Sequence, residues 1–254
     1  MCLLTGAGGT LGTLICRHYA DRFDIAAVYR TTRPAVASQD QEAVDPLEPD
    51  RSLAENGRRV FAIQADVTND ADCERVVEMT LSRYDRIDLL VNGAVASTWA
   101  PMLGTDRLLG SAALQMATNV IAPLRLSTAV ARHFWQNRDE ENRRHNRNIV
   151  NVSSVAGLRL YPFSGQSVYA ASKAALNQLT GHMAQEFAAL GVRVNATAAN
   201  SFPSLVPTWR AADAIMTLDE SALNGAIVVV DGDADEVIQL DPFDPTGRLA
   251  SSHG

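Results

Sequence analysis

The sequence YAASK at residues 169–173 places a tyrosine and a lysine four positions apart. On a helix this spacing brings Tyr169 and Lys173 to one face, so both side chains can reach the same bound ligand. Free tyrosine has a pKa of about 10, which is too high for easy proton exchange near neutral pH. A neighbouring cation favours the tyrosinate and lowers that pKa. The pair therefore predicts a general acid/base that acts on a carbonyl or an alcohol.

Lys173 is the only lysine of the chain, against 21 arginines. A guanidinium is a rigid planar fork that does not release its proton near neutral pH, whereas lysine is a compact charge on a flexible stem. A lysine can therefore bond two adjacent hydroxyl groups of a ligand and join a proton relay. We interpret this one exception as a sign of chemical constraint, and we expect Lys173→Arg to lower activity far more than stability.

Two serines, Ser153 and Ser154, end the predicted strand RNIVNVSS. In open α/β sheets the carboxyl ends of the strands line the ligand crevice, so a hydroxyl there can hold a substrate oxygen while Tyr169 protonates it. Each residue also fits a structural role, with Tyr169 as a core aromatic and Ser154 as a cap of the strand. Their joint presence in this order favours the catalytic interpretation.

Apolar runs alternate with helical patterns along the chain, and this arrangement must position the reactive residues. Continuous apolar strands separated by helices are typical of a parallel sheet that is covered on both faces. The sequence predicts one α/β domain, a doubly wound Rossmann-type fold with a parallel sheet between helix layers. The predicted strands lie at 2–4, 24–30, 59–69, 87–95, 147–154, 192–199 and, as the last, 225–232; the helices between them include 70–84, 110–137 and 167–190.

Three segments fall outside this alternation. Residues 31–59 are rich in Pro, Asp, Glu and Gln, which predicts a helix remnant and a solvated insertion. The stretch ENRRHNRN at 141–148 is interpreted as a solvated charged loop. We place the domain at 1–240 and expect the tail 241–254 to be poorly ordered, with a role in subunit contact as the alternative.

Composition bounds the class of protein. The 254 residues are 46% hydrophobic and 20% charged, which suits one soluble domain with a full core. No run approaches the roughly 18 apolar residues of a membrane span, and no secretion signal is recognisable. The net charge of −7 argues against nucleic acid or an anionic membrane as a partner. Cys2, Cys16 and Cys73 lack metal or disulfide spacing, so we expect no metal and a cytoplasmic location.

The sequence TGAGGTLG at 5–12 joins the first strand to the first helix. Its glycines allow a tight turn and a close backbone approach to a pyrophosphate, and the free N–H groups of the helix attract phosphate charge. The pattern is informative because it lies in the first strand-to-helix turn of an alternating chain. It predicts a dinucleotide site, with a glycine turn that binds nothing as the alternative.

The second strand ends in VYRTTR at 28–33 and carries no acid there. An NAD site usually has a carboxylate at this position to bond the adenine ribose hydroxyls. Arg30 and Arg33 can instead grip a 2′-phosphate and stack on adenine. We therefore predict NADP(H) rather than NAD(H), with a solvated charge at the strand end as the alternative for either arginine.

These motifs together resemble the short-chain dehydrogenase/reductase family along nearly the full chain. The resemblance rests on TGAGGTLG, ADV at 65–67, LLVNGAV, Asn119 in ATNVIAP, NVSSVAG, YAASK and RVNA. It implies that Tyr169 is the catalytic acid/base and that Lys173 bonds the nicotinamide ribose and assists it. It also implies that Ser154 orients the substrate carbonyl and that Asn119 holds a water of the proton relay.

The resemblance extends to the cofactor site. Asp66 would meet the adenine amino group, with Val67 beside it, and residues 92–94 would line the cofactor crevice. The predicted cofactor-binding residues are Thr5, Gly6, Gly9, Thr10, Leu11, Gly12, Arg30, Thr31, Asp66, Val67, Asn92, Gly93, Ala94, Tyr169 and Lys173.

The sequence departs from the family pattern at several positions. Thr10 stands where the family often has glycine, and the usual Asn-Asn-Ala-Gly reads NGAV at 92–95. The Pro-Gly that usually helps to seat the nicotinamide reads AN at 199–200, with Ser201 or Ser204 as candidate substitutes. The segment that normally carries the substrate lid is short, so we expect an open pocket or one completed by a neighbouring subunit.

Several aromatic residues fall in loops that should surround the pocket, and such a lining favours a cyclic or flat substrate. The alternative is that they cover hydrophobic surface or a subunit contact. The residues concerned are Trp99, Tyr161, Phe163, Phe202 and Trp209.

The sequence as a whole predicts an NADPH-dependent ketoreductase or alcohol dehydrogenase acting on a small molecule. One alternative is a non-catalytic NADP(H)-binding regulator or scaffold on the same fold. Another is an epimerase or dehydratase that uses the nicotinamide transiently. The resemblance also implies a homodimer or homotetramer that pairs through the helices carrying Asn119 and Tyr169.

Overall fold

The computed structural model describes residues 1–40, 59–103, 106–161, 165–232 and 234–240. These residues form one α/β domain around a sheet of nine strands in the order β3-β4-β2-β1-β5-β6-β7-β8-β9. All neighbouring strands are parallel except β8 and β9. The strands are β1 (Cys2–Thr5), β2 (Ile25–Tyr29), β3 (Gln39–Asp40), β4 (Val60–Gln64), β5 (Leu89–Asn92), β6 (Asn148–Ser154), β7 (Arg193–Ala199), β8 (Ala226–Asp231) and β9 (Ala234–Gln239).

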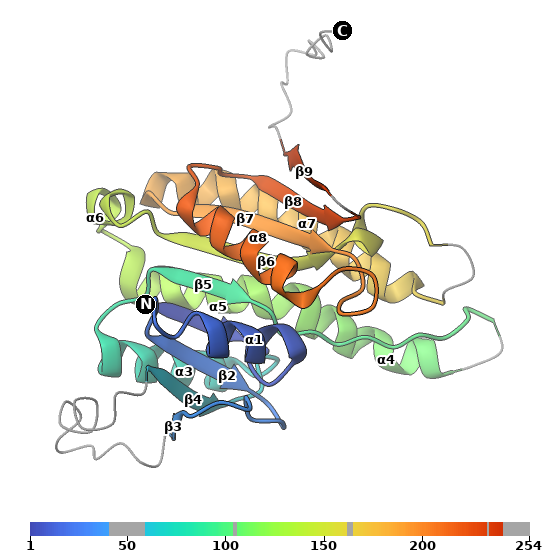
Figure 1. Cartoon of the computed structure of the whole chain (residues 1–254), viewed down its shortest axis with the longest axis horizontal. Coiled ribbons are helices and arrows are strands. Elements are labelled where there is room, and N and C mark those ends of the chain that lie inside the picture. The colour runs from blue at the N-terminus through green and yellow to red at the C-terminus, as the bar shows by residue number, and fades with distance from the viewer. Residues whose placement is uncertain (41–58, 104–105, 162–164, 233, 241–254) are drawn as a thin grey trace, which may run out of the picture.

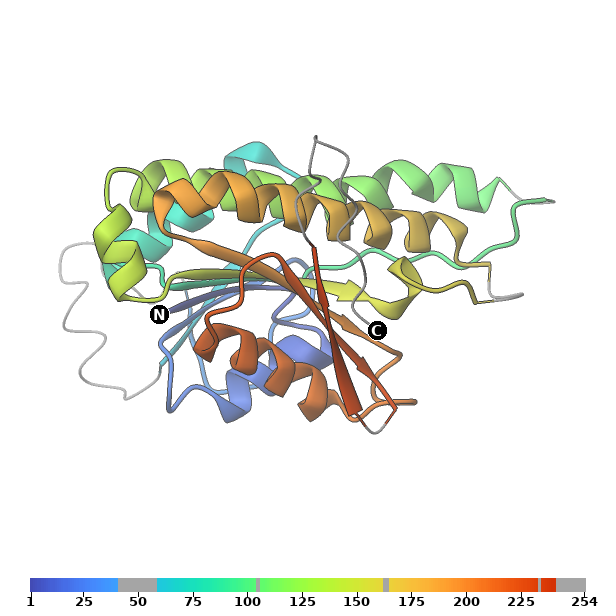
Figure 2. The same ribbon diagram turned by 90° about the horizontal axis from the view of Figure 1, so that it is seen from above.

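Helices cover both faces of the sheet, which confirms the predicted doubly wound fold (Figures 1 and 2). Alternate residues of a strand point to opposite faces, so Leu4 packs in one core cluster and Leu3 in the other. Both faces are buried, which is why the strands read as continuous apolar runs. One face carries α1 (Thr10–His18) and α8 (Thr208–Glu220); the other carries α3 (Asp70–Tyr84), α4 (Arg107–Met116), α5 (Ala122–Val130) and α7 (Ser167–Phe187).

The order of the strands fixes where a ligand can bind. β1 lies in the middle of the sheet, with β2 on one side and β5 on the other, so strand order reverses beside β1. In this kind of sheet the connections leave in opposite directions at such a point and open a crevice at the carboxyl ends of the strands. The glycine turn after β1, the loop after β5 and the serines that end β6 all lie at these ends.

The long helix predicted over 110–137 is present as a helical run from Arg107 to Trp135. Two π-helical segments interrupt it, Ala117–Ile121 and Ala131–Trp135. Such segments widen a helix by about one residue per turn and occur frequently at functional sites. Asn119 lies in the first of them, which shifts the direction of its side chain relative to a regular helix.

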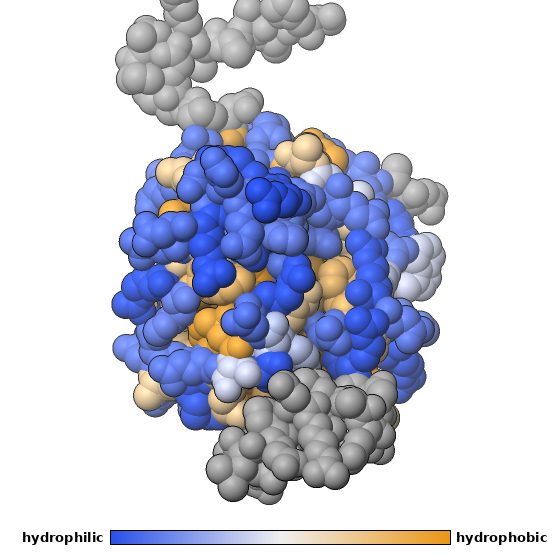
Figure 3. Space-filling model, turned by 90° about the vertical axis from the view of Figure 1, so that its left-hand side faces the viewer, coloured by the Kyte–Doolittle hydropathy of each residue, from blue (hydrophilic) through white to orange (hydrophobic). Residues whose placement is uncertain are grey.

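The prediction of a solvated charged loop at 141–148 is correct only in part, since residues 143–146 are exposed and Asn142, Arg147 and Asn148 are buried. Helix α6 (Asp139–Arg144) covers its first half, and the Arg147 side chain is 1% exposed. The guanidinium lies 2.6 Å from Glu141 and 3.5 Å from Asp88, and it stacks 4.4 Å from the ring centroid of Phe134. Ion pairing makes its burial tolerable. Figure 3 looks onto this end of the molecule, where most of the surface is hydrophilic.

The strand at 225–232 is not the last one, because β9 follows it as an antiparallel edge strand paired from Asp231↔Ala234 to Ala226↔Gln239. Residues 31–38 contain no helix, and β3 follows them; the rest of the predicted insertion, from 41 to 58, lies outside the described residues. The tail 241–254 and Phe163 also lie outside them. No helix in the described part of the chain is long and apolar enough to cross a membrane.

Candidate active site

The glycine turn brings three backbone segments into close contact. Gly6 has a φ of 72°, and a Cβ there would lie 2.4 Å from the carbonyl oxygen of Gly93. A Cβ on Gly8 would lie 1.6 Å from the carbonyl oxygen of Thr32. Glycine is therefore required at both positions, because any side chain would displace the loops after β2 and β5. Helix α1 then begins at Thr10, with no acidic residue in its first turn. Its free N–H groups can therefore donate hydrogen bonds to an anionic group.

Thr5 fixes the loop after β5, where the sequence departs from the family pattern. Its Oγ1 accepts hydrogen bonds from the backbone N–H groups of Gly93 at 3.0 Å and Ala94 at 3.1 Å. A Cβ at Gly93 would lie 2.8 Å from the carbonyl oxygen of Thr5. The tight contact between the two loops therefore persists without the usual final glycine, since Gly93 supplies the space.

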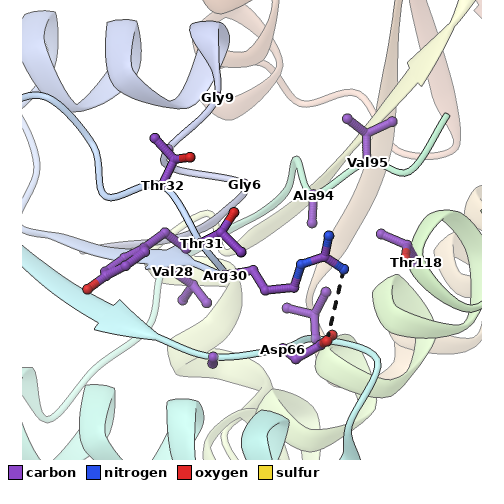
Figure 4. Close-up of a pocket in the computed structure, with 14 residues that line it drawn as sticks. Gly6, Gly9, Val28, Arg30, Thr31, Thr32, Asp66, Ala94, Val95 and Thr118 are labelled. Carbon is purple, nitrogen blue, oxygen red and sulfur yellow. Dashed lines mark ion pairs between the residues drawn. The ribbon is translucent and has the colours of Figure 1, made fainter. Parts of the chain in front are cut away.

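A cavity of about 250 Å³ lies between the glycine turn and the ends of β2 and β4. Arg30 points into it from β2, and its guanidinium lies 4.0 Å from the carboxylate of Asp66 (Figure 4). Asp66 is held in place because its Oδ1 accepts hydrogen bonds from the backbone and side chain of Thr68. Thr31, Thr32 and Val67 line the same cavity. The arrangement offers the Arg30 guanidinium, the Asp66 carboxylate and several hydroxyl groups to a ligand.

The second arginine of VYRTTR does not join this cavity. Arg33 donates hydrogen bonds to the hydroxyl of Ser38 at 2.9 and 3.2 Å. Of the two arginines named from the sequence, Arg30 alone lines the cavity.

A larger cavity of about 690 Å³ continues from the glycine turn to the catalytic candidates, and here we call it the catalytic cavity. Ser154, Tyr169 and Lys173 line one end, and Thr10, Leu11 and Gly12 line the other. It shares Gly6, Gly9 and Val95 with the smaller cavity. A single groove therefore runs from Arg30 past the helix N-terminus to Tyr169, which is the path that a dinucleotide requires.

The lysine is buried beside the tyrosine without touching its hydroxyl. The Lys173 side chain is 2% exposed, and its Nζ donates a hydrogen bond to the carbonyl oxygen of Val152 at 2.8 Å. The same Nζ lies 5.8 Å from the ring centroid of Tyr169. Burial lowers the pKa of Lys173 to about 8, because desolvation penalises the charged form.

The expectation that the lysine lowers the pKa of the tyrosine is wrong for this structure. Burial raises the pKa of Tyr169 above its usual value of 10, and a hydrogen bond with Ser154 acts in the opposite direction. Desolvation outweighs the effect of that bond on the pKa of Tyr169. Lys173 does not add to the lowering, because it directs its ammonium group to Val152 rather than to the phenol. Ser154 is thus the group that favours the tyrosinate.

Asn119 links the loop after β5 to α7. It is fully buried, and its Nδ2 donates to the Ala96 carbonyl at 2.8 Å and to Ser172 Oγ at 2.9 Å. Its Oδ1 accepts from the Ala96 backbone at 2.9 Å, and Ser172 in turn donates to the Tyr169 carbonyl at 2.7 Å. The side chain therefore positions the catalytic helix, and the predicted relay water stays a prediction.

Asn92 is turned into the interior of the protein. Its Nδ2 donates to Asn151 Oδ1 at 2.9 Å and to Ser127 Oγ at 3.3 Å. Its neighbours Gly93 and Ala94 line the cavities, and Asn92 itself lines neither. After β7, Ser201 lines the catalytic cavity, while Ser204 donates to the Ser201 carbonyl at 3.4 Å.

Some lining residues were not found from the sequence. Gly8, Thr32 and Thr118 line the smaller cavity, and Ser97, Gln166 and Leu205 line the catalytic cavity. Gly8 stands in the glycine turn and could have been found there. Thr32 and Thr118 lie within VYRTTR and ATNVIAP and could also have been found. The remaining three come from segments that no motif marks. No cluster of three or more His, Cys, Asp or Glu suited to a metal occurs in the described part of the chain.

Comparisons with known proteins agree with this geometry. A family model described as short chain dehydrogenase matches residues 1–208. The 2-(R)-hydroxypropyl-CoM dehydrogenase of Xanthobacter autotrophicus is 29% identical over 203 residues, which cover 68% of this chain and 77% of that protein. A diacetyl reductase ((S)-acetoin forming) of Staphylococcus epidermidis is 27% identical over 197 residues, 76% of this chain and 68% of that one.

The fold comparison extends over more of the chain. The crystal structure of a short chain dehydrogenase from Mycobacterium smegmatis matches with a TM-score of 0.71 and 27% identity, and covers 92% of both chains. The glycine turn, the crevice and the family match therefore agree with one another. The chain belongs to the short-chain dehydrogenase/reductase family, oxidoreductases of alcohol and carbonyl groups that use a nicotinamide cofactor.

Proposed function

We propose that the protein is an NADPH-dependent ketoreductase or alcohol dehydrogenase in which Tyr169 is the general acid/base. The observation that carries this proposal is the shared cavity: Ser154, Tyr169 and Lys173 line the same space as the glycine turn. A reacting carbonyl beside Tyr169 would therefore lie next to a cofactor bound across that turn. The residues fit a dinucleotide, because Gly6 and Gly9 line both cavities and the first turn of α1 beside them carries no acidic residue that would repel a pyrophosphate.

The bound cofactor would supply the hydride chemistry, and the protein would supply orientation and proton transfer. Ser154 and Tyr169 both present hydroxyl groups to the cavity, so together they can hold one carbonyl oxygen. A tyrosine whose pKa is raised is protonated at neutral pH and can donate that proton to the oxygen as negative charge develops on it. Lys173, with a pKa of about 8, can supply a proton near neutral pH. Because its Nζ bonds the Val152 carbonyl rather than the phenol, that proton would reach Tyr169 through a bridging water.

Arg30 supports NADP(H) as the cofactor. It is the cation that points into the smaller cavity (Figure 4), and a guanidinium matches the geometry of a phosphate. The hydroxyls of Thr31 and Thr32 line the same space. Asp66, 4.0 Å away, keeps the guanidinium at the mouth of the cavity.

We expect wild-type protein to bind NADPH more tightly than NADH. Arg30→Ala should weaken NADPH binding about 10- to 100-fold, the value of a charge-assisted hydrogen bond, and should weaken NADH binding by less than about 3-fold. The matched control is Arg33→Ala, which removes an arginine that bonds Ser38 instead. Titration calorimetry with both nucleotides measures these affinities. Tighter binding of NADH by the wild type would contradict the proposed role of Arg30.

We also propose that the protein works in the cytoplasm as a homo-oligomer. Apolar side chains are exposed along the helical run from α4 to α5: Leu109, Leu114, Met116, Ile121 and Leu124. A row of this kind on a soluble domain favours a protein contact. Light scattering should give twice or four times the mass of one chain, and Leu124→Glu should lower that mass. A wild-type mass of 27.4 kDa would contradict the oligomer.

A further inference from the structure

A second cavity of about 690 Å³ adjoins the catalytic cavity, and here we call it the outer chamber. Its walls come from residues 99–102 after β5, residues 156–161 after β6, and residues 165–170 at the start of α7. Four residues line both spaces: Trp99, Ala156, Tyr161 and Gln166. These four therefore form the boundary that a substrate would cross between the two cavities.

The catalytic cavity has limited room for a substrate. Its lining runs from the glycine turn and the start of α1 to Tyr169, so a bound cofactor would occupy much of it. The reacting carbon of a substrate would take the space beside Tyr169. Any larger part of the substrate would extend across the shared boundary into the outer chamber.

The walls of the outer chamber are held by backbone contacts. The N–H of Ala100 donates to the carbonyl oxygen of Gly165 at 3.0 Å. Gly165 has a φ of 63°, and a Cβ there would come within 3.0 Å of the Ala100 backbone. On the other wall, a Cβ at Gly157 would lie 2.7 Å from the backbone of Lys173. The loops of the outer chamber are thus fixed to each other and to the catalytic helix.

The chemistry of the lining indicates an uncharged occupant. Pro101, Met102 and Leu160 contribute apolar surface, and Arg159 is the only charged residue among the described lining residues. The Arg159 guanidinium lies 2.8 Å from Asp231 and 3.5 Å from Glu236. Two carboxylates already neutralise this cation, so it has little attraction for an anionic substrate.

We infer that the outer chamber binds the apolar, uncharged body of an extended ketone or secondary alcohol whose reacting carbon lies at Tyr169. The inference rests on the proposed reductase function and names its substrate class. Trp99 and Tyr161 would contact the chain where it leaves the catalytic cavity. Specificity then comes from chain length rather than from recognition of a charge.

A series of 2-alkanones from four to ten carbons tests the inference. With NADPH, kcat/KM of the wild type should rise about 2- to 4-fold per methylene group, the value of burying one CH2. Ala170→Phe fills the outer chamber, since Ala170 lines that chamber and not the catalytic cavity. It should lower the ratio of kcat/KM for 2-decanone over 2-butanone at least about 10-fold. The matched control is Ala171→Phe, one position further on the same helix and exposed, which should keep the wild-type ratio.

The outcomes separate this inference from the proposed function. Turnover that is independent of chain length, or a preference for a carboxylate-ended ketone such as levulinate, would contradict the binding of an apolar chain in the outer chamber. Either result would leave the proposed reductase function unchanged. If no carbonyl is turned over, calorimetry can measure the affinity of the protein with NADP⁺ for 2-alkanols of different chain length, and this affinity shows whether the outer chamber binds an apolar chain. Affinity that rises with chain length and falls in Ala170→Phe would retain the chamber without the reductase, and affinity independent of length would overturn both.

Discussion

Tyr169→Phe is expected to lower kcat for reduction of a ketone by about 100- to 10,000-fold, the range that general acid/base catalysis contributes. The phenylalanine ring keeps the packing of the tyrosine and removes only the hydroxyl, which faces Ser154 and the catalytic cavity. Binding of NADPH should change by less than about 3-fold, since the groove over the glycine turn is untouched. Steady-state kinetics with 2-decanone, together with calorimetric titration of NADPH, measures both effects.

The matched control is Tyr84→Phe, which removes a hydroxyl at the end of α3 that lines no cavity described for this structure. Its kcat should stay within about 2-fold of the wild type. Wild-type turnover in Tyr169→Phe would mean that another group donates the proton. Tight NADPH binding without turnover of any carbonyl would instead favour the regulatory alternative, and exchange of substrate stereochemistry without net oxidation would favour an epimerase.

Seven of the nine described strands could be predicted because each carries a strong local signal, whereas β3 and β9 were not predicted. β1, β2 and β5 are buried on both faces, and continuous apolar runs have no other common explanation in an alternating chain. β9 carries no such signal, since its sequence ADEVIQ is polar at half of its positions and it pairs only along one edge, with β8. Helix α6 was missed because its sequence DEENRR is polar throughout and carries no apolar periodicity. The burial of Arg147, just after this helix, depends on Asp88, which is distant in sequence.

In the candidate site, too, the residues that belong to motifs could be predicted and their partners could not. Ser154, Tyr169, Lys173 and the glycine turn were found because each belongs to a motif, and the parallel topology brings the carboxyl ends of the strands together. The hydrogen-bond partners could not be found, because they depend on which side chains meet in space. Asn119 binds Ala96 and Ser172, and Arg33 binds Ser38. The pKa of Tyr169 was misjudged because burial, which no motif records, outweighs the expected charge effect.

Lys173→Met should abolish most activity and yet stabilise the fold at neutral pH. The folded-state pKa of about 8 lies below the ordinary value of 10.5, so keeping this buried ammonium charged at pH 7 costs on the order of 3 kcal/mol. Loss of the bond to Val152 offsets about 1 kcal/mol of the gain. Urea unfolding at pH 7 should therefore give a midpoint above that of the wild type, while kcat falls at least about 100-fold.

The stability difference between the wild type and Lys173→Met should depend on pH. Between pH 8 and 10.5 the unfolded chain holds the proton of Lys173 and the folded protein does not, so wild-type stability rises with pH across this window. Lys173→Met lacks that rise, and its advantage should shrink towards pH 10. An arginine in place of Lys173 must keep its charge at every pH in a site that is 2% exposed. Lys173→Arg should therefore lose stability as well as activity, which revises the expectation from the sequence that it would lose mainly activity. A midpoint for Lys173→Met below the wild type at pH 7 would mean that the lysine supports the fold rather than the chemistry.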